Sequence, residues 1–291
     1  MYNSLVITFR KTILLVFIIV FLIGMRAGAQ AKEITVVASF YPAYITELNV
    51  VKDVPGIRVV NLTTGAQGCL HDYALTTNDM RTLSKADIFV VNGAGTEGFL
   101  EEVAKQYPKL RIVRLTDTVP LIENNPHVWL SISGVVVGAK NLGRAMQELD
   151  PDRAELYQKN TDDYVLKLEK LGLKLYSQLS PHKGAKIITL HDAFVYFAHE
   201  FGLEVVAVIE REPGAQPSAQ DLAQIIEVVR KCGVKAIFSD QWVLIPALQT
   251  VTLETGVPNY VLDLAVSGPD DPEAYIKIMQ KNAQTIIEAL Q

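Results

Sequence analysis

Hydrophobic residues recur along this chain at two spacings. Short runs of β-branched and other apolar residues, typical of buried strands, alternate with stretches in which apolar residues return every three or four positions, typical of amphipathic helices. The apolar runs lie at residues 33–39, 57–62, 87–92 and 111–115 in the first half of the chain, and at 186–190, 204–209, 235–239 and 260–263 in the second. The helical patterns lie at residues 41–51, 78–85, 98–106, 193–200, 219–231, 246–254 and 272–290. Alternation of strand and helix predicts parallel sheets with helices on both faces.

The longest helical pattern covers residues 151–180, near the middle of the chain. Its apolar side chains fall on one stripe: Tyr157, Tyr164, Leu168, Leu171, Leu175 and Leu179. Asp150 is placed to cap this helix and Pro151 suits its first turn. Thirty residues of α-helix extend roughly 45 Å, which is longer than a small domain. The pattern predicts two parallel-sheet α/β lobes, at residues 30–150 and 181–291, joined by one long backbone helix.

The N-terminal segment has the pattern of an export signal. Arg10 and Lys11 precede a mostly apolar run from Thr12 to Met25, and a small-x-small sequence follows at residues 27–29. The apolar run is shorter than the roughly 20 residues that a membrane-spanning helix needs. We expect residues 1–29 to be a cleaved signal peptide, and the mature chain to be soluble in the periplasm or an equivalent extracytoplasmic space. No cysteine lies near the cleavage point, so lipid attachment there is not expected.

Composition narrows the possible ligands. The 291 residues are 49% hydrophobic and 20% charged, which is enough to bury a substantial core. Loss of residues 1–29 removes three basic residues and no acidic one, so the net charge moves from −5 to −8. An acidic exported protein is a poor candidate for binding nucleic acid or anionic membranes and a reasonable one for cations. The two cysteines, Cys69 and Cys232, are too few for a disulfide framework, and we expect them to be unpaired.

Candidate metal ligands lie where the predicted strands end. His191 and Asp263 directly follow strands of the second half, while His71 and His127 lie in loops after the second and fourth strands of the first half. In open parallel sheets, ligands bind in the crevice beyond the carboxyl ends of the strands. Four side chains from four loops can therefore face one crevice.

Each of these residues also has a structural interpretation. His71 could form a surface pair with the aspartate that follows it, and His127 could be a core histidine. His191 precedes Asp192, a preferred helix cap, and Asp263 could stabilise a turn. Their shared placement at strand ends is what favours a metal site. The other two histidines, His182 in a loop and His199 within a helix, are interpreted as structural or surface residues.

Four segments carry a resemblance to a known family: GCLHDYALTTNDMRTLSKADIFVVNGAG, NPHVWLS, TLHDAFVYFAHEFGL and VLDLAVSGPDDPEAY. Together they resemble the metal-binding solute-binding proteins of ABC importers for zinc and manganese, of the cluster A-I type, over essentially the whole mature chain. The resemblance implies a metal held between two α/β lobes by His71, His127, His191 and Asp263. It also implies delivery to a membrane permease with its ATPase, by a protein expected to be a monomer.

The expected cargo is Zn(II), with Mn(II) as the alternative. Three imidazoles and one carboxylate suit tetrahedral zinc, whereas manganese prefers more oxygen ligands. In the resembled family a glutamate at the third ligand position leans toward manganese, and this chain has His191 there. The loop rich in histidine and acidic residues that many zinc-specific members carry is missing before His127. Leu70 and Val195 also depart from the family pattern, although neither is a ligand.

Other functions were weighed against transport. A zinc-dependent hydrolase needs an open coordination position and a general base, whereas four protein ligands close the coordination shell. An adhesin-like surface lipoprotein of the same fold is disfavoured because there is no lipid-attachment cysteine. No phosphate-binding loop of the GxxxxGK[ST] type occurs, so the energy for transport must come from a partner. The chain is therefore not expected to be an enzyme.

Overall fold

The computed structural model describes residues 33–64, 70, 73–210, 217–240 and 246–291. His71, Cys69 and the expected signal peptide at residues 1–29 fall outside these ranges. None of the helices within the described ranges is long and apolar enough to cross a membrane. Residues Ile34–Gln291 form one compact unit.

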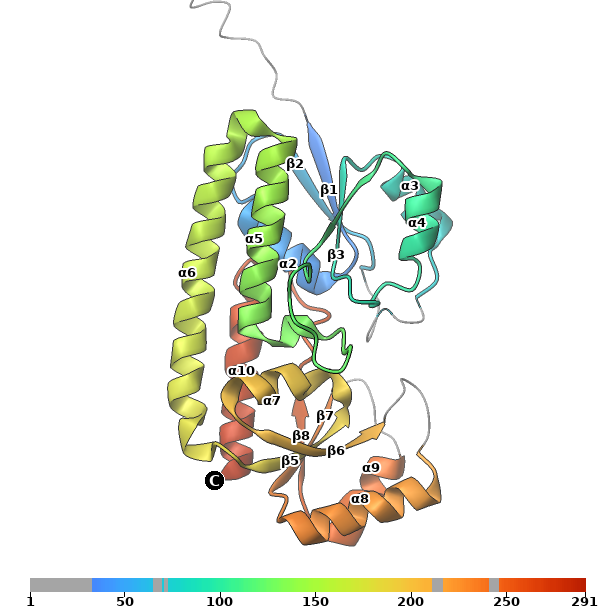
Figure 1. Cartoon of the computed structure of the whole chain (residues 1–291), viewed down its shortest axis with the longest axis vertical. Helices are drawn as coiled ribbons and strands as arrows, with labels where there is room; N and C mark the ends of the chain where they lie inside the picture. Colours follow the sequence, from blue (N-terminus) through green and yellow to red (C-terminus); the bar gives the residue numbers. More distant parts are fainter. Residues whose placement is uncertain (1–32, 65–69, 71–72, 211–216, 241–245) are drawn as a thin grey trace, which may run out of the picture. The chain divides into compact units, whose positions relative to one another are not determined.

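The first lobe is built on a four-stranded parallel sheet with the strand order β2-β1-β3-β4. Its strands are β1 (Ile34–Ala38), β2 (Ile57–Asn61), β3 (Ile88–Val91) and β4 (Arg111–Arg114). Its helices include α2 (Tyr41–Val50), α3 (Thr77–Leu83) and α4 (Leu100–Gln106). In Figure 1, α2 lies on one side of this sheet and α3 and α4 lie on the other. The predicted arrangement of a parallel sheet between helical layers is confirmed.

The second lobe repeats this topology. Its parallel sheet has the order β6-β5-β7-β8, formed by β5 (Lys186–His191), β6 (Glu204–Glu210), β7 (Ala236–Asp240) and β8 (Asn259–Leu262). The accompanying helices are α7 (Val195–Phe201), α8 (Ala219–Cys232), α9 (Pro246–Thr255) and α10 (Ala274–Leu290). All eight predicted strands agree with the observed ones to within one residue at each end. Each sheet reverses its strand order at one point, between β1 and β3 and between β5 and β7, where ligand sites form in such folds.

The long helix is α6 (Ala154–Leu179), which runs beside both lobes in Figure 1. Every residue of its predicted apolar stripe is buried. The start differs from the prediction, because Pro151–Arg153 forms a separate turn of 3-10 helix and Asp150 makes no capping bond. The carboxylate of Asp150 instead accepts hydrogen bonds from Arg153 Nε at 2.5 Å and from the Tyr157 hydroxyl at 2.6 Å. These contacts fix the entry into the helix through side chains.

A second long helix, α5 (Ile132–Leu149), packs along α6 and was not predicted from the sequence. Its N-terminus is capped by Ser131, whose hydroxyl accepts a hydrogen bond from the Gly134 N–H at 2.9 Å. The two helices approach closely at Gly143, where a Cβ atom would lie only 2.2 Å from Thr161 Oγ1. Around Gly143 the long connecting helix α6 is therefore packed against α5, and two packed helices are stiffer than one helix alone.

The hydrophobic core is continuous between the lobes. One cluster runs from the first sheet through the buried faces of α5, α6, α7 and α10, and a smaller cluster lies between the second sheet and helices α8 and α9. α10, from the end of the chain, packs against both α6 and α2. The lobes are therefore held together by shared apolar surface as well as by the chain connection.

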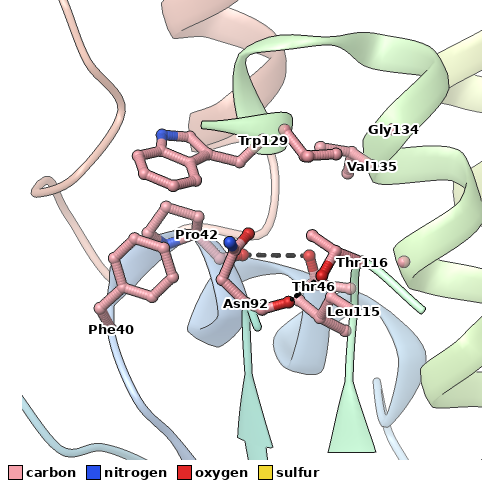
Figure 2. Close-up of a pocket in the computed structure, with 11 residues that line it drawn as sticks. Phe40, Pro42, Thr46, Asn92, Leu115, Thr116, Trp129, Gly134 and Val135 are labelled. Atoms are coloured by element: carbon pink, nitrogen blue, oxygen red, sulfur yellow. Dashed lines mark hydrogen bonds between the residues drawn. The ribbon is translucent and has the colours of Figure 1, made fainter. Parts of the chain in front are cut away.

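In the first lobe, the crevice at the point of strand reversal is filled by a polar network. The carboxylate of Glu97 accepts hydrogen bonds from Ser39 Oγ at 2.7 Å, the Asn92 N–H at 2.7 Å and the Gly93 N–H at 3.0 Å. Beside it lies a cavity of about 20 Å³, room for one water molecule, with the Thr116 hydroxyl bonded to the Asn92 carbonyl on its wall (Figure 2). The carboxylate of Glu97 is thus fully engaged by its own lobe, and the cavity beside it is large enough for about one water molecule.

Candidate metal centre

Two of the predicted ligands meet between the lobes. His127, which precedes a 3-10 turn at Val128–Leu130, comes from the first lobe, and His191, the last residue of β5, comes from the second. Their ring centroids lie 4.8 Å apart, with the rings nearly perpendicular. Both side chains are buried, so imidazole nitrogens from two lobes converge in a site with little access to water.

The ring of His127 is held by Asn125. The carboxamide oxygen of Asn125 accepts one hydrogen bond from the His127 backbone N–H at 2.9 Å and is 2.8 Å from His127 Nδ1. Because a carboxamide oxygen can only accept, Nδ1 carries the hydrogen of the neutral ring. Nε2 is then the nitrogen with which His127 would bind a metal ion.

His191 is oriented differently. Its Nδ1 accepts the backbone N–H of Ala193 at 3.1 Å, so the histidine itself caps the turn Asp192–Phe194. The structural interpretation of a cap at this position is therefore confirmed, but the capping side chain is His191 and not Asp192. Metal binding through either ring nitrogen would break this capping bond. If Nδ1 binds the metal, its lone pair is used, and if Nε2 binds, Nδ1 must carry the hydrogen of the ring and can no longer accept.

The carboxylate of Asp192 lies on the Nδ1 side of both rings. Its Oδ1 is 3.5 Å from Nδ1 of His127 and 3.4 Å from Nδ1 of His191. Among the described residues, these three side chains form the group of histidine, cysteine or acidic residues whose donor atoms are close enough to hold a metal, all within 4.8 Å of one another. Because Nδ1 of His191 already accepts from Ala193, the carboxylate cannot hydrogen-bond that ring, and we interpret Asp192 as joining the two ligand loops through its contacts with Asn125. The sequence signal for it was the dipeptide His191-Asp192.

Asp263 is the fourth predicted ligand, and it does not belong to that group. It follows β8, which is separated from β5 by β7, a distance of roughly 10 Å across two strand spacings. Its backbone N–H and C=O both pair with the side chain of buried Asn282, at 2.8 Å each. Burial raises the pKa of the Asp263 carboxyl, while the N–H of Ala265 and the charge of Lys281 oppose that rise. A bound cation would favour the ionised form of this half-buried carboxylate.

Trp129 connects the Asp263 loop to His127. Its indole N–H donates to the carbonyl of Leu264 at 2.9 Å, and its ring centroid lies 5.1 Å from that of His127. The Tyr275 hydroxyl of α10 donates to the Trp129 carbonyl at 2.8 Å. The loop that bears His127 therefore contacts both strand-end loops of the second lobe that carry predicted ligands.

The remaining predictions are placed as follows. His71, the first predicted ligand, and Cys69 lie outside the described residues. His199 is exposed on α7, and His182 is half-buried in the 3-10 turn that follows α6. Cys232, at the end of α8, is a free thiol. Sequence reasoning missed Asn125, Asp192 and Asn282, because each acts through a neighbour rather than as a ligand.

Comparisons with known proteins identify the family of the chain. The family model described as "Zinc-uptake complex component A periplasmic" (ZnuA) matches residues 36–289. The chain is 28% identical to the high-affinity zinc uptake system protein ZnuA of Bacillus subtilis, over 91% of this chain and 90% of that protein. It is 26% identical to the manganese-binding lipoprotein MntA of Halalkalibacterium halodurans, over 76% and 77%. The solved structure of FpvC from Pseudomonas aeruginosa with Mn2+ superposes with a TM-score of 0.81 and 29% identity, over 89% of this chain and 99% of that chain.

Proposed function

Because this chain belongs to the family of periplasmic zinc-uptake components A, we propose that it captures Zn(II) between its two lobes and delivers it to a membrane permease. It is a metal-binding component of an ABC importer, as its relatives are. The observation that carries the proposal is the meeting of His127 and His191 from two lobes at a ring separation of 4.8 Å. Imidazole nitrogen is a preferred ligand of zinc, with bonds of about 2.0–2.1 Å.

We propose His71, His127, His191 and Asp263 as the ligand set. The contacts of Asn125 with Asp192 and of Trp129 with Leu264 bring the three described ligand loops to one place. The burial of Asp263 supports its role, because a half-buried carboxylate gains more from a neighbouring cation than an exposed one does. Zn(II) is favoured over Mn(II) because at least two of the ligands are imidazoles.

The remaining parts of the proposal concern the setting. We propose that residues 1–29 direct export and are removed, that the protein acts as a monomer, and that a permease with an ATPase receives the cargo. The two lobes at residues 30–150 and 181–291, linked by residues 151–180, provide the two halves of the site. No catalytic step is proposed, since the family is one of transport proteins.

Competition between metals tests the choice of cargo. Protein purified without added metal, then stripped with a chelator, is titrated with Zn(II) in the presence of increasing Mn(II). We expect zinc to bind more tightly, by at least about tenfold, because imidazole-rich sites favour zinc. Displacement of zinc by an equal concentration of manganese would contradict the zinc assignment.

A further inference from the structure

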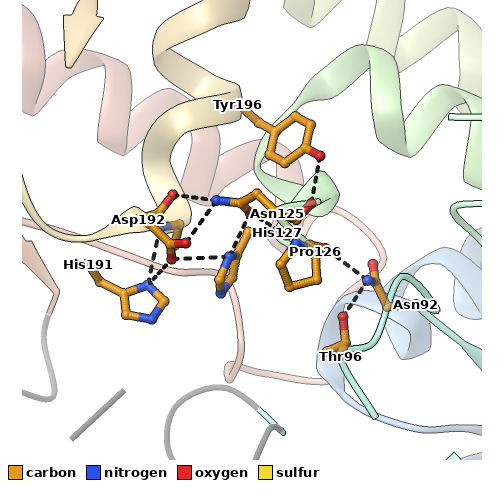
Figure 3. Close-up of polar contacts among 9 residues, drawn as sticks. Asn92, Thr96, Asn125, Pro126, His127, His191, Asp192 and Tyr196 are labelled. Atoms are coloured by element: carbon orange, nitrogen blue, oxygen red, sulfur yellow. Dashed lines mark hydrogen bonds and ion pairs between the residues drawn. The ribbon is translucent and has the colours of Figure 1, made fainter. Parts of the chain in front are cut away.

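Asn125 uses every polar atom of its side chain at the boundary between the lobes. Its carboxamide oxygen takes the two contacts from His127, and its nitrogen donates to Asp192 twice, to the backbone carbonyl at 3.0 Å and to Oδ2 at 3.1 Å (Figure 3). The side chain is 8% exposed, so these bonds are made largely away from water. Asn125 therefore joins His127 of the first lobe to Asp192 of the second, which directly follows His191.

The backbone of Asn125 is fixed on both sides. The Tyr196 hydroxyl of α7 donates to its carbonyl at 2.7 Å, and its own N–H donates to the carbonyl of Ile122 at 2.8 Å. From the first lobe, Asn92 donates to the carbonyl of Pro126 at 2.9 Å. The position of the carboxamide is thus set by both lobes, so it cannot follow one lobe without breaking contacts to the other.

We propose that Asn125 is a positioning residue that couples the orientation of His127 to the docking of the two lobes. Its oxygen keeps the hydrogen of His127 on Nδ1 and so presents Nε2 to the cargo, while its nitrogen holds the loop that bears His191. Separation of the lobes at this point breaks the bonds from the Asn125 nitrogen to Asp192, so the carboxamide that holds Nδ1 of His127 and the loop that bears His191 lose their shared anchor together. Retention of the metal then depends on lobe docking, and release requires the contact between Asn125 and Asp192 to break. The part of this proposal that concerns cargo rests on the proposed function.

Two substitutions separate the two contacts. Asn125→Asp keeps an oxygen that accepts from His127 but replaces the donor that faces Asp192 with an acceptor. Asn125→Ala removes both contacts. Matched controls are Asn141→Asp and Asn141→Ala, because the Asn141 amide also donates two hydrogen bonds, to the backbone carbonyls of Leu115 and Asp117, but both acceptors belong to the first lobe.

The first measurement uses the metal-free protein. Nitrogen-15 NMR of the histidine rings reports which nitrogen carries the hydrogen. We expect His127 to be the Nδ1–H tautomer in the unmodified protein and in Asn125→Asp, and a mixture of tautomers in Asn125→Ala. If Asn125→Ala retains a pure Nδ1–H tautomer, the positioning role is wrong. Because no metal is present, this result does not depend on the cargo.

The second measurement is the rate of zinc loss to an excess of chelator. Loss of an outer contact to a metal ligand typically weakens binding by 10–100-fold, and we expect Asn125→Ala to release zinc faster by about that factor. Asn125→Asp should fall between Asn125→Ala and the unmodified protein, and both Asn141 variants should match the unmodified protein. Equal rates for Asn125→Ala and Asn141→Ala would overturn the coupling. If the unmodified protein does not bind zinc at all, the proposed function fails, while the NMR result still decides the positioning role.

Discussion

The two lobes share one topology, but they differ in the side chains at the point where the strand order of each sheet reverses. In the first lobe, the Glu97 network lies where β1 and β3 diverge, beside a cavity that holds about one water molecule. In the second lobe, the corresponding strand β5 ends in His191, whose ring faces His127. Corresponding strand ends of one topology thus carry a polar network in the first lobe and a candidate ligand in the second.

The Glu97 network still serves the site. Glu97 holds the backbone of Asn92, and Asn92 in turn holds the carbonyl of Pro126, directly before His127. The first lobe therefore supplies a rigid support for its ligand loop, whereas the second supplies a ligand from the strand end itself. This difference predicts that substitution of His191 affects mainly metal binding, and that substitution of Glu97 affects mainly folding.

The largest effect should come from the ligand strand. Substitution of His191 by alanine removes an imidazole that faces the site, so zinc affinity should fall by more than about 100-fold, beyond the effect of losing an outer contact. Competition with a fluorescent zinc chelator measures this change. His199→Ala, an exposed histidine eight residues along the chain, is the control and should bind as the unmodified protein does. Equal affinity in the two variants would remove His191 from the site.

In the first crevice, Glu97→Ala should reduce stability. The change leaves three buried donors, on Ser39, Asn92 and Gly93, without their acceptor, and we expect the free energy of unfolding to fall by about 2–5 kcal/mol. Urea denaturation measures this loss. Glu102→Ala, an exposed residue of α4, is the control and should change stability little. If both variants unfold at the same urea concentration, the network does not support the lobe.

A second buried glutamate of the first lobe should make stability depend on pH. Glu47 in α2 is fully buried, and within the described part of the chain neither carboxylate oxygen has a hydrogen-bond partner. Burial raises its pKa well above the ordinary value, so the folded protein retains a proton that the unfolded chain releases at about pH 4.3. As the pH rises from about 4.3 to the pKa of Glu47 in the folded protein, the free energy of unfolding should therefore fall by about 1.4 kcal/mol per pH unit.

Glu47→Gln removes this titration. Because glutamine stays neutral, the variant should gain stability over the unmodified protein as the pH rises from about 4 toward 8, and should match it most closely at acid pH. Thermal unfolding of both proteins across this range provides the comparison. A constant difference between them at every pH would show that Glu47 does not titrate between the folded and unfolded states.

The smallest effect concerns a contact between the lobes. Glu200 of α7 accepts hydrogen bonds from the backbone N–H groups of Ile132, at 2.7 Å, and Ser133, at 2.9 Å, at the start of α5. A carboxylate at a helix N-terminus stabilises it, so Glu200→Gln should cost about 1 kcal/mol. Denaturation at low salt measures this cost, with exposed Glu169→Gln as the control. If added salt changed the stability of Glu200→Gln and of Glu169→Gln equally, the contact would be unimportant.

Local sequence pattern determined the elements of this protein. Strand runs and the buried stripe of α6 were predictable because strand and helix periodicities depend on near neighbours in the chain. Helix α5 was missed although its buried residues follow the helical period, and its glycines at positions 134, 138 and 143 are explained by close contacts such as that of Gly143 with Thr161. The placement of His127 and His191 at loop and strand ends was also visible in the sequence.

Only the tertiary structure decided how those histidines are held. Asn125 and Asp192 are near His127 and His191 in the sequence, whereas Asn282 is 19 residues from Asp263. Nothing in the spacing of these three residues distinguishes them from cap or surface residues. Their roles follow from contacts between segments up to 71 residues apart, as between Tyr196 and Asn125. Hydrogen bonds of this kind depend on distances and angles set by the packing of both lobes, which no local pattern specifies. The sequence thus determined which residues are candidate ligands, and the tertiary structure determined the partners of their rings, Asn125 for His127 and Ala193 for His191.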